Sequence, residues 1–217
     1  MIKIEHTDVC GWESTIRGMR NPMNSWDKSD SEWDLRSDSI DPVWFYRIGD
    51  NDLKLMKSLS KAGPDHGKFL RMINVTCDIT APLYWWKEYD TYKVGTVANS
   101  CSTMHKIQDK EFTLDDFSHE HLKASANEVM ANVIYLLNAY RSLYLENKNK
   151  DDWWQMIQLL PSSYNQKRTI QLNYQVLKSM YIARRNHKLD EWHDFCAWCE
   201  TLPYFKEICL EGGTDGK

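Results

Sequence analysis

The chain has 217 residues, of which 42% are hydrophobic and 27% are charged, as is ordinary for a single globular domain spanning 1–217. Its formal net charge of −4 argues against a basic surface that holds a nucleic-acid backbone. No run of apolar residues approaches the roughly 18 that a membrane helix needs, and the N-terminus lacks the apolar core of a signal peptide. We therefore expect a cytoplasmic protein with neither nucleic acid nor a membrane as a partner.

Alternating and helical patterns of apolar residues follow one another in the first half of the chain. Leu53, Met56 and Leu59 recur with helical spacing, whereas Val75 and Ile79 belong to a partly alternating, strand-like stretch. The aromatic stretch Tyr84-Trp85-Trp86 is expected to pack in the core or between subunits. The expected elements are an edge strand at 1–9, a helix at 12–20, a helix at 51–62, a strand at 69–79 and a helix that begins at Ala81-Pro82.

Residues 24–42 are rich in Ser and Asp and have no apolar period. Trp26 and Trp33 are scattered through them, and the length suggests a functional or mobile element. The sequence therefore predicts a surface loop here. After it, Asn51 is expected to cap the next helix, because its side chain can accept a hydrogen bond from a free N–H of the first turn.

The second half of the chain is expected to be helical. A polar loop at 94–104 precedes it, and apolar residues then recur with helical spacing. The expected helices span 125–147, 151–160, 165–185 and 190–200. The apolar positions of the longest helix are Val129, Val133, Leu136, Leu137, Tyr140 and Tyr144. Strands early in the chain and helices late in it indicate the α+β class, with a sheet flanked by helices.

Six cysteines are consistent with reduced thiols in a cytosol. Cys196 and Cys199 have the spacing of a redox or zinc motif, but they lie inside a helical pattern and no second Cys/His pair accompanies them. We therefore interpret them as structural thiols on a helix and assign no metal site.

The segment from His66 to His105 combines a histidine, a strand, the helix start at Ala81-Pro82 and a loop of small polar residues. This order resembles the signature region of the flavin-dependent thymidylate synthases, in which a histidine precedes a strand and an Ala-Pro helix start. The family signature then reads Arg-His-Arg, two residues, Ser, one residue, Asn-Glu, one residue, Ser, one residue, Arg-Tyr. Here it falls on Thr91, Tyr92, Lys93, Thr96, Asn99, Ser100, Ser102, Met104 and His105, with one extra residue between Thr96 and Asn99.

Downstream segments extend the resemblance to residues 66–200. The matching positions are Leu160-Pro161, Asn173, Arg184 and Asp190-Glu191-Trp192. The resemblance implies a central, mainly antiparallel sheet flanked by long helices, and a homotetramer whose sites are shared between subunits. It also implies methylation of dUMP, with FAD as hydride carrier and with methylenetetrahydrofolate and NADPH as co-substrates.

The resemblance further assigns roles to individual side chains. Ser102 and Arg184 would be the catalytic residues. Ser102 would lie near the reacting edge of the base, and Arg184 would hold the pyrimidine or its charge. The residues implied to hold FAD are His66, Tyr92, Lys93, Asn99 and Asn173. The residues implied to hold the nucleotide are Ser100, Ser102, His105 and Arg184.

Several charged residues of the family signature are replaced. Thr91-Tyr92-Lys93 keeps one of three possible positive charges, Ser100 stands in place of Glu, and Met104 stands in place of a phosphate-binding Arg. Each lost charged hydrogen bond is worth about 1.5–3 kcal/mol. The alternative is therefore a catalytically altered or inactive homologue that acts on another pyrimidine nucleotide or serves as a regulatory or binding protein.

The assigned residues also have purely structural interpretations, which the sequence leaves open. His66 suits a turn, Asn99 and Ser102 suit a polar loop, Asn173 suits a locally bonded helix position, and Arg184 suits a solvated helix end.

Overall fold

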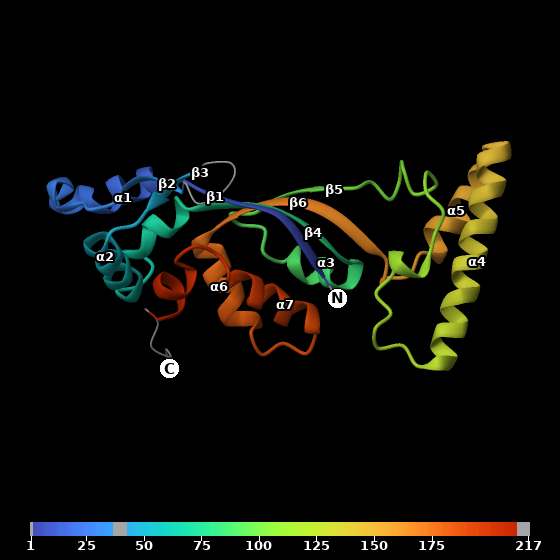
Figure 1. The fold of residues 1–217 in the computed structure, drawn as a ribbon. Coiled ribbons are helices and arrows are strands. Elements are labelled where there is room, and N and C mark those ends of the chain that lie inside the picture. The colour runs from blue at the N-terminus through green and yellow to red at the C-terminus, as the bar shows by residue number, and fades with distance from the viewer. Residues whose placement is uncertain (1, 37–42, 212–217) are drawn as a thin grey trace.

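The computed structural model describes residues 2–36 and 43–211 and is built on a four-stranded antiparallel sheet (Figure 1). The strands lie in the order β1 (Lys3–Cys10), β4 (Asn74–Pro82), β6 (Asn165–Asn173) and β5 (Val97–Ser100). Every neighbouring pair is antiparallel. The α+β class and the mainly antiparallel sheet predicted from the sequence are confirmed.

Three helices cover one face of this sheet: α3 (Leu83–Tyr89), α6 (Tyr174–Arg184) and α7 (Asp190–Cys199), all beneath the strands in Figure 1. Strand β4 alternates between buried and partly exposed residues, and its buried set includes Val75 and Ile79. The fully buried rings of Trp85 and Trp86 pack into the same core, as predicted from their aromatic character. Burial on one face only is typical of an antiparallel sheet.

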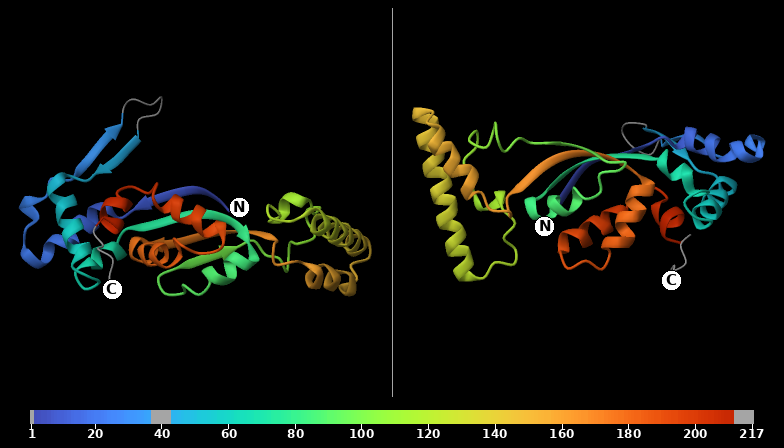
Figure 2. Two further views of the ribbon diagram at one scale, coloured as in Figure 1. Left: turned by 90° about the horizontal axis from the view of Figure 1, so that it is seen from below. Right: turned by 180° about the vertical axis from the view of Figure 1, so that it is seen from behind.

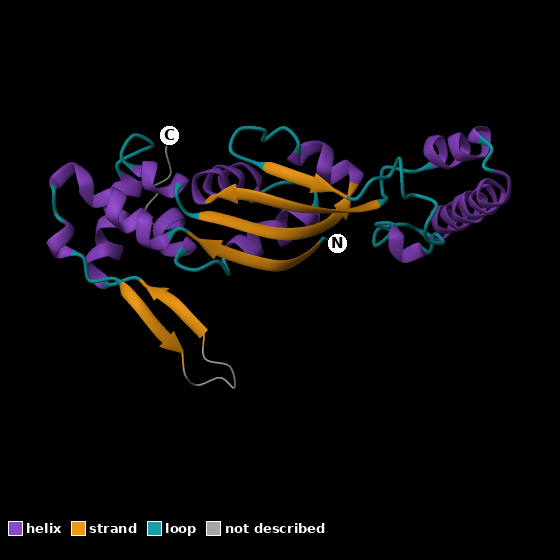
Figure 3. Ribbon diagram, turned by 90° about the horizontal axis from the view of Figure 1, so that it is seen from above, coloured by secondary structure: helices purple, strands orange, loops and turns teal. Residues whose placement is uncertain are grey.

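One end of the sheet carries two helices and a separate hairpin. Helices α1 (Trp12–Arg20) and α2 (Asp50–Lys61) pack against a 3₁₀ turn at Gly67–Arg71. Strands β2 (Glu32–Arg36) and β3 (Val43–Arg47) form a separate two-stranded sheet and project away from the body (Figures 2 and 3).

The opposite end of the molecule carries helices α4 (Ala124–Asn147) and α5 (Lys150–Leu159), which pack on each other (Figure 1). Leu137 and Met156 are fully buried between them, in a cluster separate from the core beneath the sheet. The helices predicted at 12–20, 125–147, 151–160 and 190–200 are therefore confirmed to within a residue or two. Among the described residues, no helix is both long and apolar enough to span a membrane.

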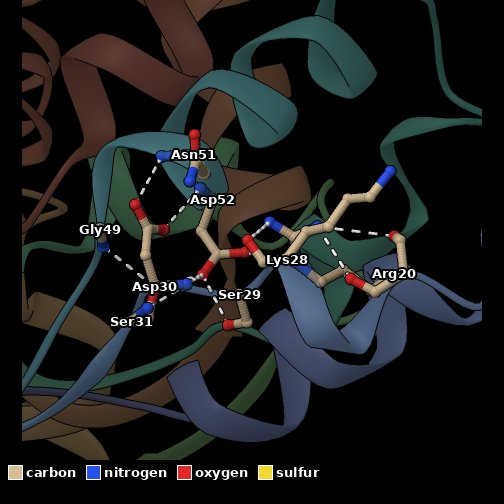
Figure 4. A network of polar contacts seen from close by, with 9 residues as sticks. Arg20, Lys28, Ser29, Asp30, Ser31, Gly49, Asn51 and Asp52 are labelled. Carbon is tan, nitrogen blue, oxygen red and sulfur yellow. Dashed lines mark hydrogen bonds and ion pairs between the residues drawn. The ribbon is translucent and has the colours of Figure 1, made fainter.

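A buried ion pair between α1 and α2 holds residues 25–31 in place (Figure 4). The Nε of Arg20 donates to Oδ1 of Asp52 at 2.6 Å, and its other nitrogens donate to the backbone oxygens of Ser25 and Lys28. The second oxygen of Asp52 accepts the hydroxyls of Ser29 at 2.7 Å and Ser31 at 2.6 Å. Residues 25–31, which follow α1, are thus fixed by hydrogen bonds that the sequence does not reveal.

The aperiodic surface loop predicted at 24–42 is therefore wrong in part. Residues 26–28 form a 3₁₀ turn and residues 32–36 form strand β2, while 37–42 lie outside the described residues. Asn51 is not a helix cap either, because Gly49 occupies the N-cap position of α2. The carboxylate of Asp30 instead accepts the N–H groups of Asn51 at 2.9 Å and Asp52 at 3.1 Å.

The helix predicted at 165–185 is also wrong in its first half. Residues 165–173 are strand β6, and only 174–184 are helical. Ile170 and Leu172 face the core while Thr169 and Gln171 are exposed, and strand β4 pairs with all nine residues of β6. The tertiary pairing decides the conformation here. Two further elements differ from the prediction in a smaller way. Strand β4, predicted from residue 69, begins at Asn74 after a 3₁₀ turn, and the polar loop predicted at 94–104 contains strand β5.

Candidate functional site

Arg184 ends helix α6 and is held in place by residues of α3 and α7. Its Nη1 donates to Oε2 of Glu88 at 2.7 Å, and its Nε donates to the hydroxyl of Tyr92 at 2.9 Å. Its guanidinium carbon lies 4.9 Å from the ring centre of Trp192 and 5.4 Å from that of Tyr92. These residues, together with His187, are called the Arg184 cluster below.

Glu88 is the centre of this cluster. The same oxygen, Oε2, also accepts the indole N–H of Trp192 at 3.2 Å and lies 3.2 Å from Nε2 of His187. Glu88 and Arg184 together carry no net charge. Within residues 2–36 and 43–211 the remaining guanidinium nitrogen, Nη2, has no hydrogen-bond partner. The cluster thus offers fixed N–H groups beside aromatic rings, which suits a neutral carbonyl oxygen better than an isolated anion.

A second half-buried arginine lies on the sheet and was missed from the sequence. Arg168 of β6 donates from Nη1 to Asp90 at 2.8 Å and from Nε to Gln166 at 3.0 Å, and its guanidinium carbon lies 4.3 Å from the Trp86 ring centre. The incorrect helix prediction hid it. Its signal was present, because Arg168 alternates with the buried residues Gln166 and Ile170.

Apart from Arg184, the residues predicted for nucleotide binding lie on the free edge of the sheet and in the turn after it, beside Asn99, which was predicted for FAD. Asn99 and Ser100 lie on β5, opposite Thr169 and Arg168, and both are exposed. The chain then turns, and the hydroxyl of Ser102 accepts the backbone N–H of His105 at 3.0 Å. Both side chains lie at the surface of this turn, with His105 the more exposed.

The other residues predicted for cofactor binding are spread over three places. Lys93 is exposed on the loop between Tyr92 and β5. Asn173 caps helix α6, since its Oδ1 accepts the backbone N–H of Val176 at 3.1 Å. His66 is exposed in the turn after α2, and its backbone N–H donates to Gly63 at 3.2 Å.

The structure therefore brings together some of the predicted residues and not others. Tyr92 and Arg184 are hydrogen-bonded, and Ser102 and His105 share one turn. In the part of the chain that the structure describes, no hydrogen bond joins His66 to either pair. Glu88 completes the first pair and was not predicted, because its partners lie about a hundred residues away in the sequence.

The Cys-X-X-Cys pair lies within helix α7, where both thiols are buried. Burial raises the pKa of Cys196 to about 11 and that of Cys199 well above its usual value. Because the thiolate is the nucleophile and the metal ligand, these shifts oppose both kinds of chemistry. Among the described residues, no three Cys, His, Asp or Glu side chains converge on a metal-binding point.

No family model matches this sequence, and no curated protein matches it. Solved structures do match. A flavin-dependent thymidylate synthase ThyX from Helicobacter pylori, in complex with FAD and dUMP, aligns over 98% of this chain and 100% of its own, with a TM-score of 0.68 and 16% identity. A second structure of that enzyme with FAD and dUMP gives a TM-score of 0.69 and 15% identity, over 98% and 99% of the two chains. The resemblance to flavin-dependent thymidylate synthases is thereby confirmed for the fold of the whole chain.

Proposed function

We propose that this protein is a flavin-dependent thymidylate synthase-like protein that binds dUMP and transfers a one-carbon unit to it. FAD would be its cofactor, and NADPH and methylenetetrahydrofolate its co-substrates. The observation that carries the proposal is the full-length similarity to an enzyme that holds FAD and dUMP. The hydrogen-bonded pair of Tyr92 and Arg184 supports it, because the family resemblance predicts both as site residues.

The exposed polar residues next to Tyr92 and along β5 are of the kinds that can hold a flavin nucleotide. Lys93 supplies a solvent-exposed positive charge, and Asn99 and Ser100 supply side-chain hydroxyl or amide groups on a free strand edge. When bound, FAD would supply the hydride for the transferred carbon. The residues of this chain would orient the pyrimidine. Arg184 would donate from Nη2 to a pyrimidine carbonyl, and the Ser102 hydroxyl would face the reacting edge of the base.

One observation favours the alternative of a nucleotide-binding homologue without synthase activity. The charge of Arg184 is already neutralised by Glu88 at 2.7 Å. Met104, where the resemblance leads one to expect a phosphate-binding arginine, is 49% exposed and offers no donor. Fewer positive charges therefore face the loop than a dianionic nucleotide needs for tight binding.

We also propose that the protein assembles into a homo-oligomer, a tetramer by the family resemblance. Val129, Leu136 and Leu143 follow one another at intervals of seven residues along α4 and are 63%, 41% and 44% exposed. The other side of α4 packs on the cluster around Leu137. A helix that is apolar all round is normally buried, and a seven-residue repeat is the spacing of a helix-to-helix contact.

Two measurements test the proposed function. Purified protein is examined for the flavin absorption band before and after addition of FAD, and the expected result is yellow protein. A colourless protein that takes up no FAD would contradict the synthase proposal. In parallel, expression in a thymidine-requiring strain should restore growth; soluble protein without growth favours the alternative.

Calorimetric titration with dUMP tests the role of the Arg184 cluster. Arg184→Ala should weaken binding by at least about tenfold, since a charge-assisted hydrogen bond is lost. Arg185→Ala is the matched control, because it removes the same side chain at the next, exposed position and should leave the affinity unchanged. Equal affinities of the two variants would show that the nucleotide binds elsewhere.

A further inference from the structure

A cavity of about 890 Å³ lies between helix α1, the β2–β3 hairpin and residues 203–207. Its volume falls within the usual range for sites that hold small molecules. It shares no residue with the Arg184 cluster or with the β5 edge, so neither part of the proposed function accounts for it. The lining residues all belong to the described part of the chain.

The walls of this cavity are aromatic. The pairing of Trp33 with Tyr46, two residues along from the pairing of Leu35 with Trp44, places these four side chains on one face of the hairpin. Trp33 is 55% exposed and Trp44 is 64% exposed, an unusual setting for indole rings. The Trp33 and Tyr46 rings meet edge to face at 5.3 Å. The hairpin therefore presents an aromatic face that the protein's own packing leaves largely open.

The floor of the cavity adds two more rings. Trp12, at the start of α1, meets Tyr204 edge to face with ring centres 5.7 Å apart. Trp12 is buried, and the hydroxyl of Tyr204 accepts the backbone N–H of Ile48 at 3.2 Å. This bond joins the C-terminal segment to the base of the hairpin and fixes the floor relative to the wall.

The charges that line the cavity are mainly negative. Among the described residues that line it, there are three carboxylates, of Asp8, Glu13 and Glu207, one cation, Arg17, and no lysine. Glu13 lies 4.0 Å from Arg17 and also accepts the indole N–H of Trp33 at 3.4 Å. A phosphate or carboxylate ligand would meet net repulsion here, whereas a cation would be attracted by both the carboxylates and the ring faces.

We propose that this cavity is a second binding site, for an organic cation with a planar aromatic ring. Trp33, Trp44 and Tyr46 would contact the ring and its positive charge, and the carboxylates of Glu13 and Glu207 would balance that charge. The proposal stands independently of the thymidylate synthase-like function, because the two sites share no residue. The proposal predicts that the cavity distinguishes ligands with the same ring by their charge.

The test uses three probes that share the quinoline ring and differ mainly in charge. N-methylquinolinium, neutral quinoline and anionic quinoline-2-carboxylate are titrated into the full-length protein by calorimetry at mildly alkaline pH. The cation should bind at least about tenfold more tightly than quinoline, and the anion should bind most weakly. Equal affinities for the cation and quinoline, or no binding of the cation at millimolar concentration, would overturn the proposal.

Variants then locate the binding. Trp44→Ala should weaken N-methylquinolinium binding by about tenfold, while Trp154→Ala, which truncates a 40% exposed tryptophan of α5 outside the cavity, should not. Arg17→Gln removes the arginine of the lining and should tighten binding, a gain that a misfolded variant would not give. If Trp44→Ala binds N-methylquinolinium normally, the site is refuted. If the cation binds to no form of the protein and Trp44→Ala dissociates an oligomer, the hairpin face is a protein contact and the site is likewise refuted.

Discussion

Replacing Asp52 by asparagine tests whether the buried ion pair holds the N-terminal part of the fold together. The Asp52 side chain is fully buried and that of Arg20 is 5% exposed. Asparagine keeps the shape of the side chain but removes its charge and turns one acceptor into a donor. The guanidinium of Arg20 then remains buried with only neutral oxygens as partners. Breaking a buried pair in this way costs about 3–5 kcal/mol.

That loss is a large share of the roughly 5–15 kcal/mol that stabilises a typical domain. It should lower Tm by about 2–4 °C for each kcal/mol in a chain of this size. Urea unfolding followed by circular dichroism measures the free energy of unfolding directly. Asp65→Asn removes an exposed carboxylate and should change that free energy by less than about 0.5 kcal/mol.

The pH dependence gives a second measure of the same carboxylate. Burial alone would raise the pKa of Asp52, but the hydrogen bonds from Ser31, Ser29 and Arg20 outweigh it and the pKa is lowered. A lowered folded-state pKa stabilises the protein above the unfolded value of about 3.9, and this stabilisation is lost as the pH falls through the folded-state pKa. Asp52→Asn should remove this part of the acid sensitivity. A loss below about 1 kcal/mol at neutral pH would refute the argument that the pair is essential.

Four further predictions concern the site, the assembly and the thiols. Glu88→Gln should tighten dUMP binding about tenfold in titration, because it frees the charge of the neighbouring guanidinium; weaker binding would instead assign Glu88 a purely positioning role. Met104→Arg should tighten dUMP binding by a similar factor if the turn faces the phosphate, and an unchanged affinity would disprove that alignment. Leu136→Asp should reduce the molecular mass measured by sedimentation, and an unchanged mass would place the subunit contact elsewhere. Exposed Cys10 should react with a thiol reagent in the native state, whereas Cys199, buried and with a raised pKa, should react only on unfolding; rapid labelling of both would contradict its burial.

The parts of the fold that the sequence predicts well are those decided by local pattern. Helix α1 begins and ends at the predicted residues, Trp12 and Arg20, because its buried positions recur every three or four residues and a proline follows. Strand β6 was missed because its nine residues alternate only in part and its conformation depends on β4, which lies about ninety residues earlier. Long-range pairing of this kind leaves little trace in a local window.

In the candidate site, too, residues that belong to a sequence pattern were predicted, and residues that depend on long-range contacts were not. Tyr92 and Arg184 were predicted from a family pattern, and the structure joins them by a hydrogen bond of 2.9 Å. Glu88 has no such pattern, because a lone glutamate on a short helix is usually a solvated residue. Its role emerges only when α3, α6 and α7 meet and three donors converge on one carboxylate oxygen.

One of the replaced signature residues, Tyr92, belongs to the Arg184 cluster. Where the family resemblance leads one to expect a histidine, Tyr92 directs its hydroxyl to Arg184 and fixes the guanidinium, while Glu88 cancels its charge. An arginine that is held and neutralised distinguishes hydrogen-bonding patterns on a ring more readily than it attracts an anion. Affinity for a nucleotide would then depend on the base more than on the phosphate. The positive charge that binds the phosphate would then come from Lys93 or from a neighbouring subunit. In the second case the site would be complete only in the oligomer.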